Sequence, residues 1–217
     1  HKSIGGYHAA KLRRYQEMID AYISPEMQKM MPAIVQGMGD MTKLNGDSIF
    51  PVLNMLNAKY FILPLQNGQT VPLQNPYVNG NAWYVDKLDY VDNANEEIDK
   101  IGKINLKHEA VADKKFEAEL GKAVPQGTTS LVTLKSYEPN HLVYEANSDK
   151  GGVIVFSEIY YPEWTATVDG TPVELGRANY ILRALQVKPG KHEIVLDFHP
   201  ASIRTTETIA YLALIHI

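Results

Sequence analysis

Short runs of β-favouring residues alternate with turn residues along the second half of the chain, at intervals of about eight to twelve positions. In the last run His192, Ile194, Leu196 and Phe198 alternate with more polar residues, so one face of that strand is mostly apolar. No helical pattern interrupts this rhythm, which is typical of an antiparallel sandwich or barrel. We therefore predict strands at 131–137, 141–147, 153–159, 164–168, 171–175, 180–187 and 191–198.

An Asp-Gly pair separates two of these strands, because Asp169 and Gly170 stand between Val168 and Thr171. Both central positions of a two-residue hairpin need positive φ, which Asp and Gly tolerate at low cost. The pair predicts a tight hairpin that sets the register of the strands on either side.

The first half has a different pattern. Apolar residues recur every three or four positions from Tyr7 to Ile23, the spacing of an amphipathic helix. We predict that this helix ends at Ser24-Pro25 and that a second helix begins there, with Pro in its first turn. The methionines at 27–31 indicate core packing, with a pliable binding surface as the alternative.

Further along we predict a helix at 48–58, a strand at 59–63, hairpin-like or edge structure at 64–76, a strand at 83–85, a helix at 96–101 capped by Asn93 or Asn95, and a strand at 109–113.

These patterns predict an α+β protein in which a mixed α+β subdomain, 1–127, precedes a jelly-roll-like antiparallel β-sandwich, 128–204. The run from Ile209 to Ile217 is apolar except for His216 but falls short of the roughly 20 residues that span a bilayer. Segment 205–217 is therefore either the start of a truncated transmembrane helix or a terminal core element. Because the chain begins at His1 without a signal pattern, we expect it to be a piece of a longer protein.

Composition narrows the function classes. The chain has 217 residues, 45% hydrophobic and 21% charged, which is ordinary for a protein that buries a sizeable core. The net charge of −4 and the pI near 6.0 provide no basic field for a phosphate backbone, so nucleic acid is not an expected partner. The absence of cysteine excludes disulfides and thiolate chemistry and leaves the compartment open.

Motifs for metal, nucleotide or nucleophile sites are absent from the sequence. The seven histidines form no HExxH or HxH group, and Gly37-Met38-Gly39 lacks the third glycine of a dinucleotide-binding turn. The acidic stretch 86–99 lacks EF-hand spacing and is interpreted as a solvated helix entrance. Ser157 lacks a nucleophile elbow. We therefore expect no catalytic residue, no metal ligand and no cofactor.

Aromatic residues provide a better indication. A flat ring with polar neighbours can stack on a sugar, so six residues are candidates for contacting a glycan: Tyr160, Tyr161, Trp164, Asp169, Arg183 and Trp83. Core packing is the competing interpretation, and it is favoured for Trp164 and Trp83 because large aromatics in a sandwich usually fill the interior.

Several strings resemble a known family, the YfhO-like bacterial membrane proteins in the version found in Bacteroidetes, and specifically their C-terminal extracytoplasmic region. The strings are GGYHAAKLRRYQ from position 5, LNMLNAKY from 53, GNAWYV from 80, SEIYYPEWTATVDG from 157 and RANYILRALQVKPGKHEI from 177. The resemblance implies a polytopic membrane protein of the GT-C glycosyltransferase type, with flanking transmembrane helices outside this chain. It also implies a location on the extracytoplasmic face, and it assigns no catalytic residue to this chain.

The leading expectation is a non-catalytic extracytoplasmic domain that positions a glycan or cell-envelope acceptor. A structural or protein-interaction domain without sugar affinity is the first alternative. The second is a secreted glycosidase, because Glu158 and Glu163 flank the aromatic pair Tyr160-Tyr161 and glycoside hydrolysis uses two carboxylates.

Overall fold

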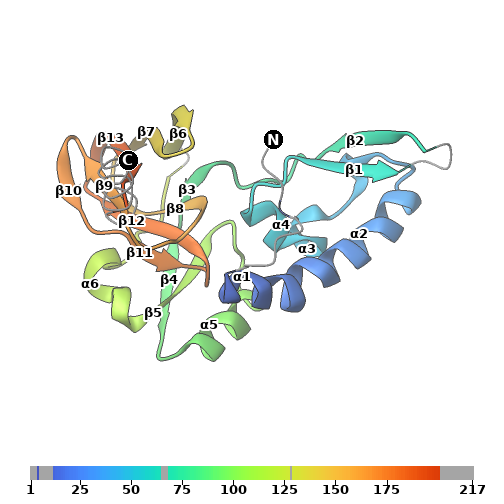
Figure 1. The fold of residues 1–217 in the computed structure, drawn as a ribbon, viewed down its shortest axis with the longest axis horizontal. Coiled ribbons are helices and arrows are strands. Elements are labelled where there is room, and N and C mark those ends of the chain that lie inside the picture. Colours follow the sequence, from blue (N-terminus) through green and yellow to red (C-terminus); the bar gives the residue numbers. More distant parts are fainter. Residues whose placement is uncertain (1–3, 5–11, 65–67, 128, 201–217) are drawn as a thin grey trace, which may run out of the picture.

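The computed structural model describes residues 4, 12–64, 68–127 and 129–200. It is an α+β structure in which helices and a hairpin from the first part of the chain lie beside an antiparallel β-sandwich (Figure 1). The predicted fold class is confirmed. Segment 205–217 lies outside the described residues.

The sandwich consists of two antiparallel sheets. The five-stranded sheet has the order β10-β9-β13-β7-β6, and the four-stranded sheet has the order β11-β12-β8-β3. Their facing sides pack Tyr144 and Phe156 edge to face and bury Ile194 and Leu196 completely, as the alternating pattern predicts. The strands are β3 (Ala82–Tyr84), β6 (Leu131–Glu138), β7 (His141–Ser148), β8 (Gly152–Ile159), β9 (Trp164–Val168), β10 (Thr171–Val173), β11 (Gly176–Ala178), β12 (Leu182–Val187) and β13 (Gly190–Phe198).

The turns of the sandwich follow their sequence signals with one exception. Asp169 and Gly170 both have positive φ, 51° and 76°, and Thr171 pairs with Val168, so the predicted hairpin is confirmed. Tyr180 was predicted to begin a strand, but it lies in the turn between β11 and β12 with φ of 71°. That prediction is wrong because the preceding Asn179 already turns the chain, with φ of 48°.

The N-terminal helices form one continuous helical run, α1 (Arg13–Met18), a π-helical turn η1 (Ile19–Ile23) and α2 (Ser24–Gln36). The predicted end at Ser24-Pro25 is therefore wrong. Pro25 has no N–H to donate, and the wider π turn directly before it accommodates that interruption without ending the helix. Residues 7–11 of the predicted helix lie outside the described residues.

The predicted helix at 48–58 is instead two short helices, α3 (Gly46–Ile49) and α4 (Pro51–Met55), preceded by a 3₁₀ turn η2 (Met41–Lys43). The break falls at Phe50, whose φ of −141° is extended because it precedes Pro51. Strands β1 (Tyr60–Pro64) and β2 (Thr70–Gln74) then form a separate two-stranded hairpin. The hairpin-like structure predicted for this segment is confirmed.

A parallel βαβ unit follows, with β4 (Lys87–Val91), α5 (Ala94–Ile101) and β5 (Glu109–Asp113). Helix α5 and strand β5 match the prediction, and Asn93 is the residue that caps the helix. Strand β4 contradicts our interpretation of 86–99 as a helix entrance only. Its acidic Asp89 lies between the ammonium groups of Lys87 and Lys100, at 3.0 and 2.9 Å, and this pairing allows a carboxylate within the strand. A 3₁₀ turn η3 (Lys114–Phe116) and helix α6 (Glu117–Leu120) complete the segment.

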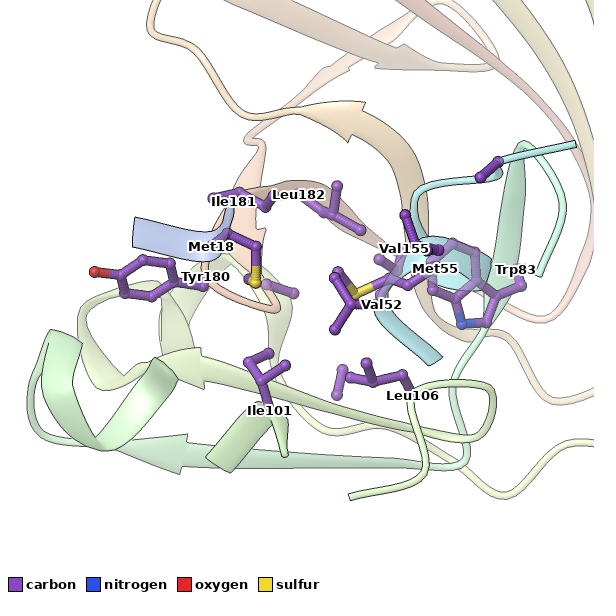
Figure 2. Packing of buried hydrophobic residues seen from close by; sticks show 14 of the residues in the cluster. Met18, Val52, Met55, Trp83, Ile101, Leu106, Val155, Tyr180, Ile181 and Leu182 are labelled. Carbon is purple, nitrogen blue, oxygen red and sulfur yellow. The ribbon is translucent and has the colours of Figure 1, made fainter. Parts of the chain in front are cut away.

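A shared core joins the helices to the sandwich. Figure 2 shows Met18 of α1, Met55 of α4, Trp83 of β3, Val155 of β8 and Leu182 of β12 in one hydrophobic cluster. These side chains come from both halves of the sequence. Among the described residues, no helix combines the length and apolarity required to cross a bilayer.

A buried ion network lies near this core. The fully buried Glu97 of α5 lies 2.9 Å from Arg177 of β11 and 3.1 Å from Arg14 of α1. It also accepts a hydrogen bond from the Tyr180 backbone N–H. Helix α1, the βαβ unit and the sandwich therefore meet at one carboxylate.

Candidate functional site

Three of the candidate residues meet where β8 passes into β9, and with Phe198 they form a surface that we call the aromatic end: Tyr161, Trp164, Arg183 and Phe198. The Arg183 guanidinium carbon lies 3.6 Å from the centroid of the Trp164 ring. Phe198 stacks on the same indole at 5.3 Å, and Tyr161 meets Phe198 edge-on at 6.0 Å. Tyr161 is 43% exposed, so its ring is the one the aromatic end offers to solvent.

Arg183 is unusual for an arginine because it is only 4% exposed. Its Nε donates to the Ile159 carbonyl at 3.0 Å, while its Nη1 is buried and has no hydrogen-bond partner among the described residues. Burial lowers the pKa of Arg183 to about 10, and the charge of Glu158 partly offsets that shift. The arginine reaches this position at a β-bulge between Leu182 and Arg183.

The other three candidates lie apart from the aromatic end or are occupied by packing. Tyr160 is half-buried and meets Phe116 edge-on at 5.6 Å. Asp169 follows the opposite end of β9, about 16 Å from Trp164 along the strand. There its Oδ2 lies 2.7 Å from His192 Nδ1, and this hydrogen bond lowers the pKa of Asp169. Trp83 is 8% exposed and packs in the shared core.

A second surface is a groove of about 650 Å³ along the free edge of β3, which we call the β3-edge groove. In an antiparallel ladder, alternate residues direct their N–H and C=O groups to the same side. Asn81 and Val85 bond to β8, through Asn81 O and Val85 N, so Ala82 and Tyr84 direct their backbone groups toward the groove. Its walls come from segments 79–84, 107–108, 126–127 and 130–134, together with Asp86.

The lining of the β3-edge groove combines polar and apolar side chains and is nearly neutral, since amides and hydroxyls outnumber charges. Hydrogen bonds hold its walls: Asp86 lies 3.0 Å from His108 Nδ1 and accepts from the Gln126 N–H at 2.6 Å, and Asn79 donates to the Leu106 carbonyl at 3.0 Å. Trp83 contributes to the wall, and its Nε1 is buried with no partner among the described residues. The uncharged polar side chains that line the groove are Asn79, Asn81, Gln126, Ser130 and Thr133.

Comparison with known proteins identifies the family. The family model described as "Bacterial membrane protein YfhO" matches residues 50–210. The chain belongs to the YfhO family. No curated protein and no solved structure matches it. All residues of the aromatic end and of the β3-edge groove fall inside the part of this YfhO-family chain that the model matches, whereas α2 falls outside it.

The sequence did not single out this groove in the YfhO-family chain. Four short segments line it, spread over residues 79–134, and none carries a spaced motif. The signal that the sequence did contain was Trp83, which we selected as a candidate and which forms part of the wall.

The serine considered as a nucleophile and the two carboxylates of the hydrolase alternative have different surroundings. Ser157 Oγ donates to the carbonyls of Met55 and Gly80, at 2.8 and 2.7 Å, so this hydroxyl joins the helices to β8. Glu163 is exposed in a left-handed backbone turn, with φ of 73°, and Glu158 is half-buried. Across the part of the chain that the structure describes, no three or more His, Asp or Glu residues gather as they would around a metal ion.

Proposed function

We propose that this segment of a YfhO-family protein binds a cell-envelope glycan without modifying it and positions that glycan for a membrane-embedded glycosyltransferase of the GT-C type. The segment acts on the extracytoplasmic face of the membrane. The observation that carries the proposal is the β3-edge groove, whose volume lies within the range of ligand pockets.

The lining of the groove suits a neutral, hydroxyl-rich ligand. Side-chain amides and hydroxyls both donate and accept hydrogen bonds, as sugar hydroxyls do, so each can pair with the ligand. The backbone groups of Ala82 and Tyr84 add donors and acceptors along the free edge. The groove is lined by one negative side chain, Asp86, and one positive side chain, Lys107, so it does not select strongly for an ionic ligand.

The aromatic end is a second contact surface in this proposal. Tyr161 supplies an exposed ring for stacking on a sugar, and Arg183 and Trp164 hold Phe198 and that ring in place. Tyr160, the neighbour of Tyr161 in the same loop, anchors that loop through its ring contact with Phe116. Asp169 acts at the other end of β9 by ordering the hairpin.

The two tryptophans of the chain allow a sharp binding test, since Trp83 reports on the groove and Trp164 on the aromatic end. We expect Trp164→Phe to leave a fluorescence change when the chain is titrated with a panel of envelope glycans. Adding Thr133→Arg should fill the groove and weaken affinity at least about tenfold, which is about 1.4 kcal/mol. The matched control is Thr171→Arg, because Thr171 is also an exposed strand threonine but lies on the opposite edge of the same sheet.

A structural or protein-interaction role is the second candidate, and one observation favours it. Both tryptophans already pack against protein groups, Trp83 in the core and Trp164 on Arg183 and Phe198. This role predicts no fluorescence response to any glycan in the panel. It also predicts that Thr133→Arg in the full-length membrane protein leaves glycan transfer to the acceptor unchanged, whereas glycan positioning predicts reduced transfer.

A further inference from the structure

Large exposed apolar side chains gather on one helix, α2, and the loop that follows it. Their spacing of four, four and three positions places them on one side of the helix, where they continue beyond its last turn. Ordinary surfaces scatter such residues singly, and a contiguous group marks an interaction site. We call this group the α2 apolar stripe: Met27 (52% exposed), Met31 (40%), Val35 (73%) and Met38 (82%).

The same part of the molecule continues this character in the β1–β2 hairpin. Neither strand of the hairpin contains a charged residue, and Tyr60 and Ile62 are each 59% exposed. In Figure 1 the hairpin and α2 extend together away from the sandwich. In the sandwich, by contrast, exposed large apolar residues are scattered singly: Leu131, Tyr137 and Tyr161.

The charged side chain that α2 exposes to solvent is positive. The only carboxylate of the helix, Glu26, is 6% exposed and accepts hydrogen bonds from the backbone N–H groups of Val52 and Leu53. Lys29 is exposed on the same helix. Although the whole chain carries a net charge of −4, α2 offers solvent a lysine and no acid.

We propose that the α2 apolar stripe rests on the surface of an anionic phospholipid bilayer. Long, flexible methionine side chains enter the boundary between headgroups and acyl chains, while a nearby lysine meets the headgroup charge. An exposed tyrosine such as Tyr60 suits the same boundary because its ring is apolar and its hydroxyl is polar. The family description, a bacterial membrane protein, favours a lipid surface over a second copy of the chain. This contact is independent of the glycan site.

The test measures flotation of the 217-residue chain with vesicles of equal parts phosphatidylglycerol and phosphatidylcholine. We expect the chain to float with the vesicles. The double substitution Met31→Glu and Val35→Glu should lower the bound fraction at least about tenfold, because two charges replace methyl groups that the bilayer would bury. The control is Tyr137→Glu, since Tyr137 is 46% exposed but lies on the sandwich and outside the β3-edge groove. It should bind vesicles as the unchanged chain does.

Three results would overturn the proposal. The first is that the chain does not float with these vesicles. The second is that Tyr137→Glu lowers binding as much as the double substitution does. The third is that the chain does not bind vesicles but forms a concentration-dependent dimer in sedimentation, and that the double substitution abolishes this dimer. That result would assign the stripe to contact with a second copy of the chain. Circular dichroism of each variant verifies that the helices remain folded. Thr133→Arg should alter glycan titration and leave flotation unchanged, so the two proposals can fail separately.

Discussion

Glu26 is a carboxylate almost wholly removed from solvent, at the start of α2. It is 6% exposed and accepts backbone hydrogen bonds of 2.9 Å from both Val52 and Leu53 at the start of α4. Burial raises the pKa of Glu26 to about 7, against the opposing effect of those two hydrogen bonds. The protonated acid is therefore the form that the native structure favours at mildly acidic pH.

This raised pKa predicts a loss of stability as the pH increases. Between about 4.5 and about 7 the unfolded chain has released the proton of Glu26 while the folded chain retains it. The protonated Glu26 therefore stabilises the fold fully at a pH below its pKa in the unfolded chain. This stabilisation disappears as the pH passes through its pKa in the folded chain, so the free energy of unfolding falls by about 3 kcal/mol. Urea unfolding at pH 4.5 and pH 7 measures it. Glu26→Gln should remove this part of the pH dependence.

The control for this measurement is Glu174→Gln, which removes an exposed carboxylate from the sandwich. Its free energy of unfolding should follow that of the unchanged chain across the same pH range. If Glu26→Gln retains the full pH dependence, another group causes it and the acid at Glu26 is ionised throughout.

At the scale of elements, the sequence predicted what local chemistry determines. Asn93 was expected to cap a helix, and its Oδ1 accepts from the N–H groups of Asn95 and Glu96 at 3.1 and 3.0 Å. The Asp169-Gly170 hairpin followed from the same kind of local rule. The π turn was missed because Pro25 was interpreted as the end of a helix. The acidic strand β4 was missed because Asp89 is paired by Lys100, eleven positions away, and a local pattern does not show this pairing.

Asn93→Ala should destabilise the chain by about 1 kcal/mol, because the first turn of α5 loses its side-chain acceptor. Chemical denaturation at neutral pH measures this loss. The matched control is Asn95→Ala, two positions further along and exposed inside the first turn. Alanine favours a helix interior, so that variant should be neutral or slightly more stable. Equal losses in the two variants would show that Asn93 does not cap the helix.

At the scale of the whole molecule, long-range pairing determines where the candidate surfaces lie. Of the six candidates selected from the sequence, the structure brings Tyr161, Trp164 and Arg183 together, and two of these share one loop and strand. It could not place Trp83 beside Ser130 and Thr133, since periodicity describes a strand and does not identify its neighbours. The β3-edge groove exists because β3, from the first half of the chain, pairs with β8 from the second.

This pairing also allows a test of the boundary predicted at 127/128. A fragment of residues 128–204 lacks β3, so the edge of β8 opposite Ala82, Trp83 and Tyr84 would be exposed. Val155 and Phe156, both fully buried in the whole chain, would lose their partners on that side. We expect this fragment to show no cooperative thermal transition by circular dichroism. A fragment of residues 79–204 restores β3 and the βαβ unit and should unfold cooperatively, since sheet pairing and apolar burial return together. A sharp transition in the shorter fragment would establish that the sandwich folds without β3 and that the boundary is correct.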